Sequence, residues 1–276
     1  MPDLKKIAVA FHRRAAEYDR HVAVQKRVVN NLAGHVATHL ENPPSKILDV
    51  GTGTGTLLKS MRYMYPDAAM YGVDLAFNMC LQTAAKLNGN CFVVNGDAEE
   101  LPFKNGMFDL AVSSSALQWV GNLGRALNEL RRVLKPGGTL CIAFFCAGTL
   151  VELQRSFRDA ACAGDEEKSG RTDRLHRFRS VDEVRSILEG MDFEKVTLSC
   201  ETEKDWYDDV TSLLHSIKNI GAGSIGGGAG IGLGWRGVLN ETSRLYREYY
   251  GEGGRIPATY QVLSLYARVP MTTVRQ

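Results

Sequence analysis

The chain has 276 residues, enough for one large α/β domain with insertions or for a domain with a small cap. Its hydrophobic fraction of 44% and charged fraction of 23% are ordinary for a soluble globular protein. The formal net charge of +2 provides no global attraction to nucleic acid or to an anionic membrane, so we expect neither as a partner. Any charged partner must therefore bind a local patch.

The six cysteines include no CxxC pair, and several lie in apolar runs typical of strands. We therefore expect reduced, mostly buried thiols and neither a disulfide framework nor a zinc site. His35 and His39 are four residues apart, as metal ligands on a helix can be, but no third ligand accompanies them, and we expect no metal. The N-terminal apolar stretch is too short for a signal peptide or a membrane span, so we expect a cytoplasmic protein.

Two amphipathic helices are expected first, over residues 4–18 and 22–40, where apolar residues recur at helical spacing. After the break at Asn42-Pro43-Pro44, runs typical of strands alternate with helical segments. The expected strands cover residues 46–50, 70–73, 92–95, 108–113, 139–145, 195–199 and 260–267. This alternation predicts an α/β fold of the Rossmann-like kind, with a seven-stranded, largely parallel sheet and helices on both faces.

Two connections are much longer than a plain crossover requires, and we expect them to form a helical lid over the carboxyl edge of the sheet. The expected division is residues 1–44 for helices that cover the site, 45–146 for the core, 147–192 for a first lid insertion, 193–200 for a core strand, 201–258 for a second lid insertion, and 259–276 for the last strand and tail. Residues 221–237 are rich in glycine, which predicts a mobile loop.

The first expected strand leads into a glycine-rich turn that contains Gly51, Gly53 and Gly55. Glycines at this point allow the backbone to approach a ligand at the switch point of the sheet. Alone, the turn also fits a plain strand-to-helix connection or a dinucleotide fingerprint. Asp49, two residues before the first glycine, favours S-adenosylmethionine, because a carboxylate attracts the ammonium of that ligand and would repel the pyrophosphate of a dinucleotide.

Two further acids follow the next two expected strands. Asp74, followed by Leu75, stands where a carboxylate can accept both ribose hydroxyls, which fits NAD equally well. Asp97, followed by Ala98, stands where a carboxylate can accept from the exocyclic amine of adenine, although a helix N-cap is an alternative role.

In order, DxGxGxG at 49–55, Asp74, GDAEELPF at 96–103, FDLAVSSSALQW at 108–119 and LRRVLKPGGTL at 130–140 resemble the class I methyltransferase domain. This resemblance covers residues 45–145 and implies S-adenosylmethionine as the cofactor. The stretch 113–119 is where such enzymes present the acceptor. It lacks the Asn/Asp-Pro-Pro-aromatic run of enzymes that methylate amino groups of bases or amide nitrogen, and there is no obvious acid cluster for magnesium. For Gln118-Trp119, a packed strand end and a direct ligand contact both remain open.

The outer segments resemble the malonyl-acyl-carrier-protein O-methyltransferases of biotin synthesis over nearly the whole chain. The matching residues are Phe11, Ala15, Tyr18, Asp19, His21, Gln25, and segments 117–119, 176–178, 216–222 and 257–260. The glycine stretch after Ala222 departs from the simpler loop expected in that family. The resemblance implies methyl transfer from S-adenosylmethionine to the free carboxylate of a malonyl thioester, carried by acyl carrier protein or by coenzyme A. A carboxylate is already ionised at neutral pH, so the enzyme needs orientation more than a base.

The resemblance also implies roles for individual residues. The catalytic candidates are Tyr18, Gln118, Arg177 and Lys218, and the expected cofactor-binding residues are Gln25, Asp49, Gly51, Gly53, Gly55, Asp74, Leu75, Asp97, Ala98 and Ser113. Arg177 and Lys218 would hold the malonyl carboxylate or the phosphopantetheine phosphate, since a guanidinium can grip either group with two hydrogen bonds. Tyr18 and Gln25 would close over the sulfonium. For all four, an ordinary helix or surface role is the alternative.

Residues 171–179 hold four arginines and one acid, which predicts either a docking patch for an acidic carrier protein or a solvated charged face. Two other functions stay open at this point. One is a methyltransferase that acts on a quinone, sterol or polyketide, and the other is a catalytically silent protein that binds adenosylmethionine.

Overall fold

The computed structural model describes residues 4–162, 176–220 and 233–271. The strands are β1 (Lys46–Val50), β2 (Ala69–Asp74), β3 (Phe92–Asn95), β4 (Phe108–Ser114), β5 (Leu134–Phe145), β6 (Glu194–Tyr207) and β7 (Ile256–Arg268). The α-helices are α1 (Leu4–Arg14), α2 (Ala23–His39), α3 (Thr56–Met64), α4 (Phe77–Lys86), α5 (Leu123–Val133), α6 (Val151–Cys162), α7 (Val181–Glu189), α8 (Val210–Asn219) and α9 (Leu233–Tyr250). Two short 3₁₀ helices, η1 (Tyr18–Arg20) and η2 (Leu117–Trp119), complete the described elements.

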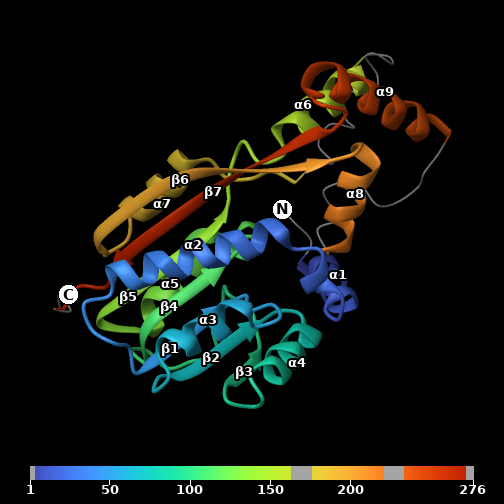
Figure 1. Cartoon of the computed structure of the whole chain (residues 1–276). Helices are drawn as coiled ribbons and strands as arrows, with labels where there is room; N and C mark the ends of the chain where they lie inside the picture. Colours follow the sequence, from blue (N-terminus) through green and yellow to red (C-terminus); the bar gives the residue numbers. More distant parts are fainter. Residues whose placement is uncertain (1–3, 163–175, 221–232, 272–276) are drawn as a thin grey trace.

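The strands form one sheet in the order β3-β2-β1-β4-β5-β7-β6 (Figure 1). The first five strands are parallel, with Ile47 of β1 opposite Met70 of β2 and Leu110 of β4. β7 runs antiparallel between β5 and β6. The seven-stranded, largely parallel α/β sheet expected from the sequence is therefore confirmed, and the reversed last strand places β6 at the edge.

Successive residues of the strands bury opposite faces of the sheet. Ile47 packs into a core with Val28 of α2 and Leu58 of α3. Leu48 packs on the other face with Leu127 of α5 and residues of α7. Ile47 and Leu48 are both fully buried. This continuous apolar run is what a parallel strand covered on both faces requires.

Two boundaries differ from those expected from the sequence. β6 continues to Tyr207 and β7 already begins at Ile256, so both strands extend into the stretch expected to be a lid. α7, expected within the first lid insertion, instead packs against α5 through Val184 and Leu188, which are buried in the sheet core. The spacing of its apolar residues fits one helix face, and Ser180 and Glu183 form a capping box at its start.

The remaining helices gather at one end of the sheet. Figure 1 shows α6, α8 and α9 beyond the ends of β6 and β7, and α1 lies toward the same end. α6 and α8 both pack against α9. Of the glycine-rich segment, residues 221–232 lie outside the described residues and residues 233–237 begin α9. Within the described ranges, no helix combines the length and the apolar character needed to cross a membrane.

Candidate active site

The turn after β1 adopts a conformation that glycine permits and other residues strain. Gly51, Gly53 and Gly55 all have positive φ angles of 71°, 55° and 79°. A Cβ on Gly51 would lie 2.2 Å from the Cβ of Ala116, so no side chain fits there. A Cβ on Gly53 would meet nothing within 4 Å, and Gly53 lines the cavity described next. The backbone at Gly53 can therefore touch a ligand directly.

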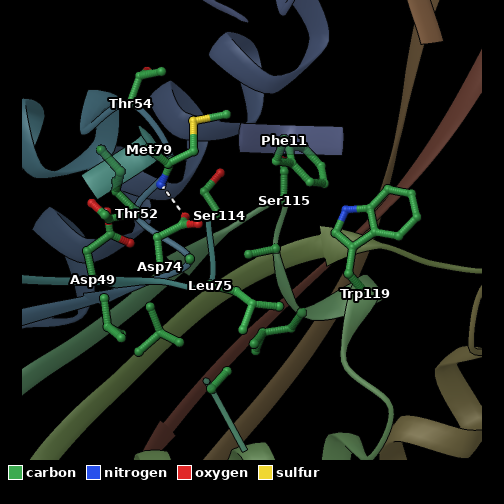
Figure 2. A pocket seen from close by; sticks show the side chains of 18 of the residues that line it. Phe11, Asp49, Thr52, Thr54, Asp74, Leu75, Met79, Ser114, Ser115 and Trp119 are labelled. Atoms are coloured by element: carbon green, nitrogen blue, oxygen red, sulfur yellow. Dashed lines mark hydrogen bonds between the residues drawn. The ribbon is translucent and has the colours of Figure 1, made fainter. Parts of the chain in front are cut away.

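A cavity of about 1100 Å³, counted to its open mouth, lies at the carboxyl ends of β1, β2 and β4. Eight of the ten expected cofactor-binding residues line it: Gln25, Asp49, Gly51, Gly53, Asp74, Leu75, Asp97 and Ala98. Figure 2 shows Asp49, Thr52 and Asp74 on one side of this cavity and Phe11 and Trp119 on the other. We name it the donor cavity.

Two carboxyl groups dominate the electrostatics of the donor cavity. Burial, and to a lesser degree the nearby Asp74 carboxylate, raises the pKa of Asp49 to about 7. The hydrogen bond from Thr52 acts in the opposite direction and lowers this pKa. Burial also raises the pKa of Asp74 to about 6, against hydrogen bonds from the backbone N–H groups of Ala76 and Gly53, each 2.8 Å long. One Asp49 oxygen, Oδ1, is buried with no hydrogen-bond partner in the part of the chain that the structure describes. Such an oxygen fits a cationic ligand group that donates hydrogen bonds.

The other two expected cofactor residues lie outside this lining. Gly55 precedes α3 and packs against Thr83, where an added Cβ would approach to 3.0 Å. Ser113 is buried within β4, and its Oγ has no partner among the described residues. The next two residues, Ser114 and Ser115, line the cavity instead. Asp97 lines the cavity and also accepts a hydrogen bond from the N–H of Glu99, so it shapes the local turn as well.

The helices before the core cover the donor cavity. Ile7 and Phe11 of α1, Tyr18 of η1 and Gln25 of α2 all line it. Burial raises the pKa of Tyr18 well above its usual value, and the carboxylates of Asp74 and Asp19 add to this effect. Its hydroxyl is therefore a protonated hydrogen-bond donor at every physiological pH.

A second cavity of about 600 Å³ adjoins the donor cavity, and we name it the acceptor cavity. The two cavities share the lining residues Phe11, Tyr18, Gln25, Ser115 and Trp119. The rest of the described lining is His21, Ala23, Val24, Gln118, Phe145, Thr149, Leu150, Phe178, Asp205, Tyr207, Ser216, Ile217, Ile220 and Tyr260. A group bound in one cavity can therefore meet a group bound in the other across this shared wall.

Ser115 stands in that wall in a strained conformation. Its φ angle is 54°, in the left-handed region that non-glycine residues rarely occupy. Gln118 Nε2 donates to the Ser115 carbonyl at 2.7 Å, which fixes this turn. The Oε1 atom of Gln118 is buried with no hydrogen-bond partner within the described ranges, and the residue lines the acceptor cavity. Both roles left open for Gln118, a packed strand end and a direct ligand contact, thus stay compatible with its position.

Aromatic rings pack against Trp119 of the shared wall. The His176 ring lies 4.6 Å from the Trp119 ring and 4.7 Å from the Phe178 ring. Burial, the largest cause, and the Arg179 charge lower the pKa of His176 to about 4, against a hydrogen bond to the Gln118 carbonyl. His176 is therefore neutral, and its Nε2–H donates to that carbonyl at 3.1 Å in the matching tautomer.

Two catalytic candidates lie outside both cavities. The side chain of Arg177 is 81% exposed and forms an ion pair of 2.5 Å with Glu183. To bind an acceptor directly, Arg177 would have to give up this ion pair. Lys218 is exposed on α8, one residue after Ile217, which lines the acceptor cavity. Residues 171–175 of the expected docking patch lie outside the described residues.

Sequence reasoning missed several residues that line the acceptor cavity. Asp205 and Tyr207 come from the extended part of β6, and Phe145 and Thr149 come from the end of β5 and the turn after it. No local motif identifies them, because they meet only through the order of the strands. The histidine pair His35 and His39 stacks with ring centroids 6.1 Å apart, and no cluster of three or more metal-ligating side chains is found among the described residues.

The donor cavity fits S-adenosylmethionine. Asp49 presents a carboxylate oxygen with no partner among the described residues, Asp74 lines the cavity at the end of β2, and the open backbone at Gly53 allows close approach of a ligand. Together with the sheet order, these features define the class: the chain is a methyltransferase that depends on S-adenosylmethionine. Residues 48–142 match the family model described as "Methyltransferase domain".

Full-length relatives narrow the class. The chain is 43% identical to a malonyl-[acyl-carrier protein] O-methyltransferase of Geobacter sulfurreducens, over 95% of this chain and 98% of the relative. It is 31% identical to one of Gallionella capsiferriformans, over 99% and 93%. The chain therefore belongs to the malonyl-[acyl-carrier protein] O-methyltransferase family. A solved SAM-dependent methyltransferase from Thermotoga maritima shares the fold, with a TM-score of 0.54, 18% identity and coverage of 95% and 99%.

Proposed function

We propose that the chain transfers the methyl group of S-adenosylmethionine to the free carboxylate of a malonyl thioester on acyl carrier protein, an early step of biotin synthesis. The acceptor cavity carries this proposal, because it shares a wall with the donor cavity. The names of the relatives support the choice of acceptor. S-adenosylmethionine supplies an electrophilic methyl group when bound.

The residues at the shared wall suit an acceptor that is already ionised. Tyr18 lines both cavities and Tyr260 lines the acceptor cavity. Burial raises the pKa of both phenols, in Tyr260 also with help from Tyr207. They therefore remain neutral donors, which can orient a carboxylate without neutralising its charge. A phenolic or amine acceptor would instead need a base to take its proton.

Residues around the wall would hold the two reactants in line. Phe11 packs against both Tyr18 and Trp119, with ring centroids 6.3 and 6.0 Å apart, and so forms an apolar rim at the junction. Such a rim excludes water from the ionised nucleophile. Gln118 holds the Ser115 turn that separates the cavities. In this proposal Tyr18 and Gln118 contact the acceptor directly, whereas Lys218, in the last turn of α8, attracts its negative charge from outside the cavity.

The proposal is tested with malonyl carrier protein and isotopically methyl-labelled S-adenosylmethionine. We expect one labelled methyl group on the malonyl moiety, detected by mass spectrometry and removed by mild alkaline hydrolysis as an ester should be. Acetyl carrier protein, which has no free carboxylate, is the matched control and should stay unlabelled. Labelling of both carrier proteins, or of neither, would contradict the proposal, and labelling of a quinol instead would support the small-molecule alternative.

A further inference from the structure

α1 has an inner face that belongs to the site. Ile7 and Phe11 of α1, and Ala15 just after its end, are each four residues apart, and Ile7 and Ala15 are buried. Ile7 and Phe11 line the donor cavity, and Phe11 also lines the acceptor cavity. Any partner that holds α1 in place therefore also holds one wall of both cavities.

The outer face of α1 is basic. Residues 4–14 contain four lysines and arginines and no acidic residue. Lys6, Val9 and Arg13 lie at positions i, i+3 and i+7, which places them on one stripe of the helix. Lys6 and Arg13 are exposed, and Val9 is 48% exposed between them. An exposed apolar side chain within a charged rim is a common arrangement at docking surfaces.

Of the two acids that follow α1, Glu17 is exposed, whereas Asp19 is bound to the core. Asp19 accepts hydrogen bonds from Lys86 Nζ at 2.6 Å and from Thr54 Oγ1 at 2.6 Å. Arg20, the next residue, is exposed and precedes His21, which lines the acceptor cavity. Among the described residues of this segment, exposed Lys6, Arg13 and Arg20 outnumber exposed Glu17, so the net charge presented to solvent is positive. We name Lys6, Arg13 and Arg20, with Val9 among them, the basic face.

α1 meets the core mainly at α4 and at the aromatic rings of the site. Ala15, just after α1, forms a small cluster with Ala76 and Met79, against which Phe11 and Tyr18 pack; this cluster is separate from the two large cores of the sheet. The side chain of Asn78 donates to the His12 carbonyl at 3.0 Å. A helix held by so small a cluster responds to a partner bound on its other side.

We infer that the basic face is the docking surface for the acidic carrier protein that delivers the malonyl chain. This inference rests on the proposed function and adds the surface to it. Opposite charges attract the carrier protein over about 10 Å at ordinary salt and orient it at the mouth of the acceptor cavity. Docking then presses the inner face of α1 against the site, so that a loaded carrier protein also completes the wall around the donor.

The other basic segments fit this partner less well. Arg177 is paired with Glu183, and Arg179 donates to the carbonyls of Val120 and Gly121 at 2.8 and 3.1 Å. On α9, Arg244 is paired with both Glu241 and Glu248. These guanidiniums have partners within the chain, whereas the guanidiniums of Arg13 and Arg20 have none among the described residues; of the basic face, Lys6 does have an interaction within the chain.

The test compares the double variant Lys6→Glu/Arg13→Glu with Lys104→Glu/Arg185→Glu, which changes the net charge equally. Lys104 and Arg185 are exposed, and neither the turn that holds Lys104 nor α7, which holds Arg185, contributes a residue to either cavity. Both double variants are assayed with malonyl carrier protein and with malonyl-N-acetylcysteamine, a small thioester that lacks the acidic protein. Binding of fluorescent carrier protein is measured by fluorescence anisotropy at several salt concentrations. This measurement reports docking independently of methyl transfer.

For Lys6→Glu/Arg13→Glu we expect KM for malonyl carrier protein and Kd for labelled carrier protein to rise roughly 10-fold or more, with a weaker dependence on salt. Its kcat/KM for the small thioester should stay within about twofold of the wild type, because no cavity contact is changed. The control variant should behave as the wild type. The inference would be overturned if this variant bound carrier protein as the wild type does, or if its activity fell equally with both acceptors. It would also be overturned if the variant lost binding to phosphatidylglycerol vesicles and kept its binding to carrier protein. A wild-type protein that binds carrier protein but does not methylate it would contradict the proposed function alone.

Discussion

Lys86 and Asp19 form an ion pair of 2.6 Å that ties η1 to α4. Lys86 Nζ also donates to Thr54 Oγ1 at 2.9 Å and Thr56 Oγ1 at 3.0 Å, so one ammonium joins η1, the glycine-rich turn and the start of α3. Burial raises the pKa of Asp19, but the hydrogen bonds from Lys86 and Thr54 outweigh it and hold the pKa below its usual value. The pair fixes the position of the adjacent Tyr18 over both cavities.

Lys86→Met should therefore weaken the binding of S-adenosylmethionine by about 1 kcal/mol, since the covering segment loses its anchor. KM for the acceptor should also rise, because Tyr18 lines both cavities. Calorimetry gives the first value and initial rates the second. Lys59→Met, on the exposed side of α3, is the control. Unaltered donor affinity in Lys86→Met would show that η1 keeps its place without the ion pair.

Asp74→Ala should weaken donor binding by roughly 1–3 kcal/mol, more than Asp97→Ala does. Asp74 accepts two backbone hydrogen bonds that shape the site, and its loss would also remove the acceptor that we expect for the ribose hydroxyls. Asp97 accepts one such bond, from Glu99, and backbone groups can still bind the adenine edge. Calorimetric titration of both variants provides the comparison. A larger loss in Asp97→Ala would reverse this ranking.

Affinity for S-adenosylmethionine should increase as the pH rises. The pKa of Asp49 is raised to about 7 and that of Asp74 to about 6 in the unliganded protein, so both carboxyls carry protons below these values. An ammonium prefers the ionised carboxylates, and binding must therefore release protons at low pH. Kd should fall roughly 10-fold between pH 5.5 and 7.5, as measured by calorimetry in buffers of different ionisation enthalpy. Asp49→Asn should bind more weakly and show a flatter pH profile. An equally steep profile in that variant would assign the titration to another group.

At saturating S-adenosylmethionine, kcat should show no basic limb that reports deprotonation of the acceptor. A carboxylate acceptor is ionised above a pH of about 4, so the rate should fall only in acid. A phenol or amine acceptor would show a rate that continues to rise as its proton is lost. The measurement is a pH profile of single-turnover rates with malonyl carrier protein. A rise that continues above pH 8 would favour the quinone or polyketide alternative.

Lys218→Ala should raise KM for the malonyl acceptor about 5- to 50-fold, whereas Arg177→Ala should change it less. Lys218 follows Ile217 of the acceptor cavity, but Arg177 points to solvent and pairs with Glu183. This order is the reverse of the one that the chemistry of the two side chains alone suggests. Steady-state kinetics of both variants, with donor affinity as the control, decides between them. Normal kinetics in Lys218→Ala together with a large defect in Arg177→Ala would show that Arg177 matters more, as the chemistry of the two side chains suggests.

The donor cavity could be predicted from the sequence because its residues lie at the ends of successive strands, where short motifs identify them. Asp49, Gly53, Asp74 and Asp97 each follow or end a run typical of a strand, and parallel strands bring such ends together. Ser113 was one position away from the serines that line the cavity, since alternation along β4 does not show where the strand gives way to the turn.

The acceptor cavity could not be predicted in the same way. Tyr207 and Asp205 reach it only because β6 extends well beyond its expected end, and Tyr260 reaches it because β7 lies between β5 and β6. Neither strand length nor strand order is encoded in a local pattern. α7 was expected in the lid for a related reason, because the length of a connection does not reveal which of its helices returns to the sheet.

The two cavities draw on different portions of the chain. Every described residue that lines the donor cavity lies between Ile7 and Val120, whereas the acceptor cavity needs residues as late as Tyr260 of the last strand. During synthesis, the parts that hold the donor leave the ribosome more than a hundred residues before the acceptor cavity can close. Substitutions after Val120 can also reshape the acceptor cavity while the donor contacts stay intact, so acceptor preference can diverge among descendants of one ancestral methyltransferase without loss of the shared cofactor.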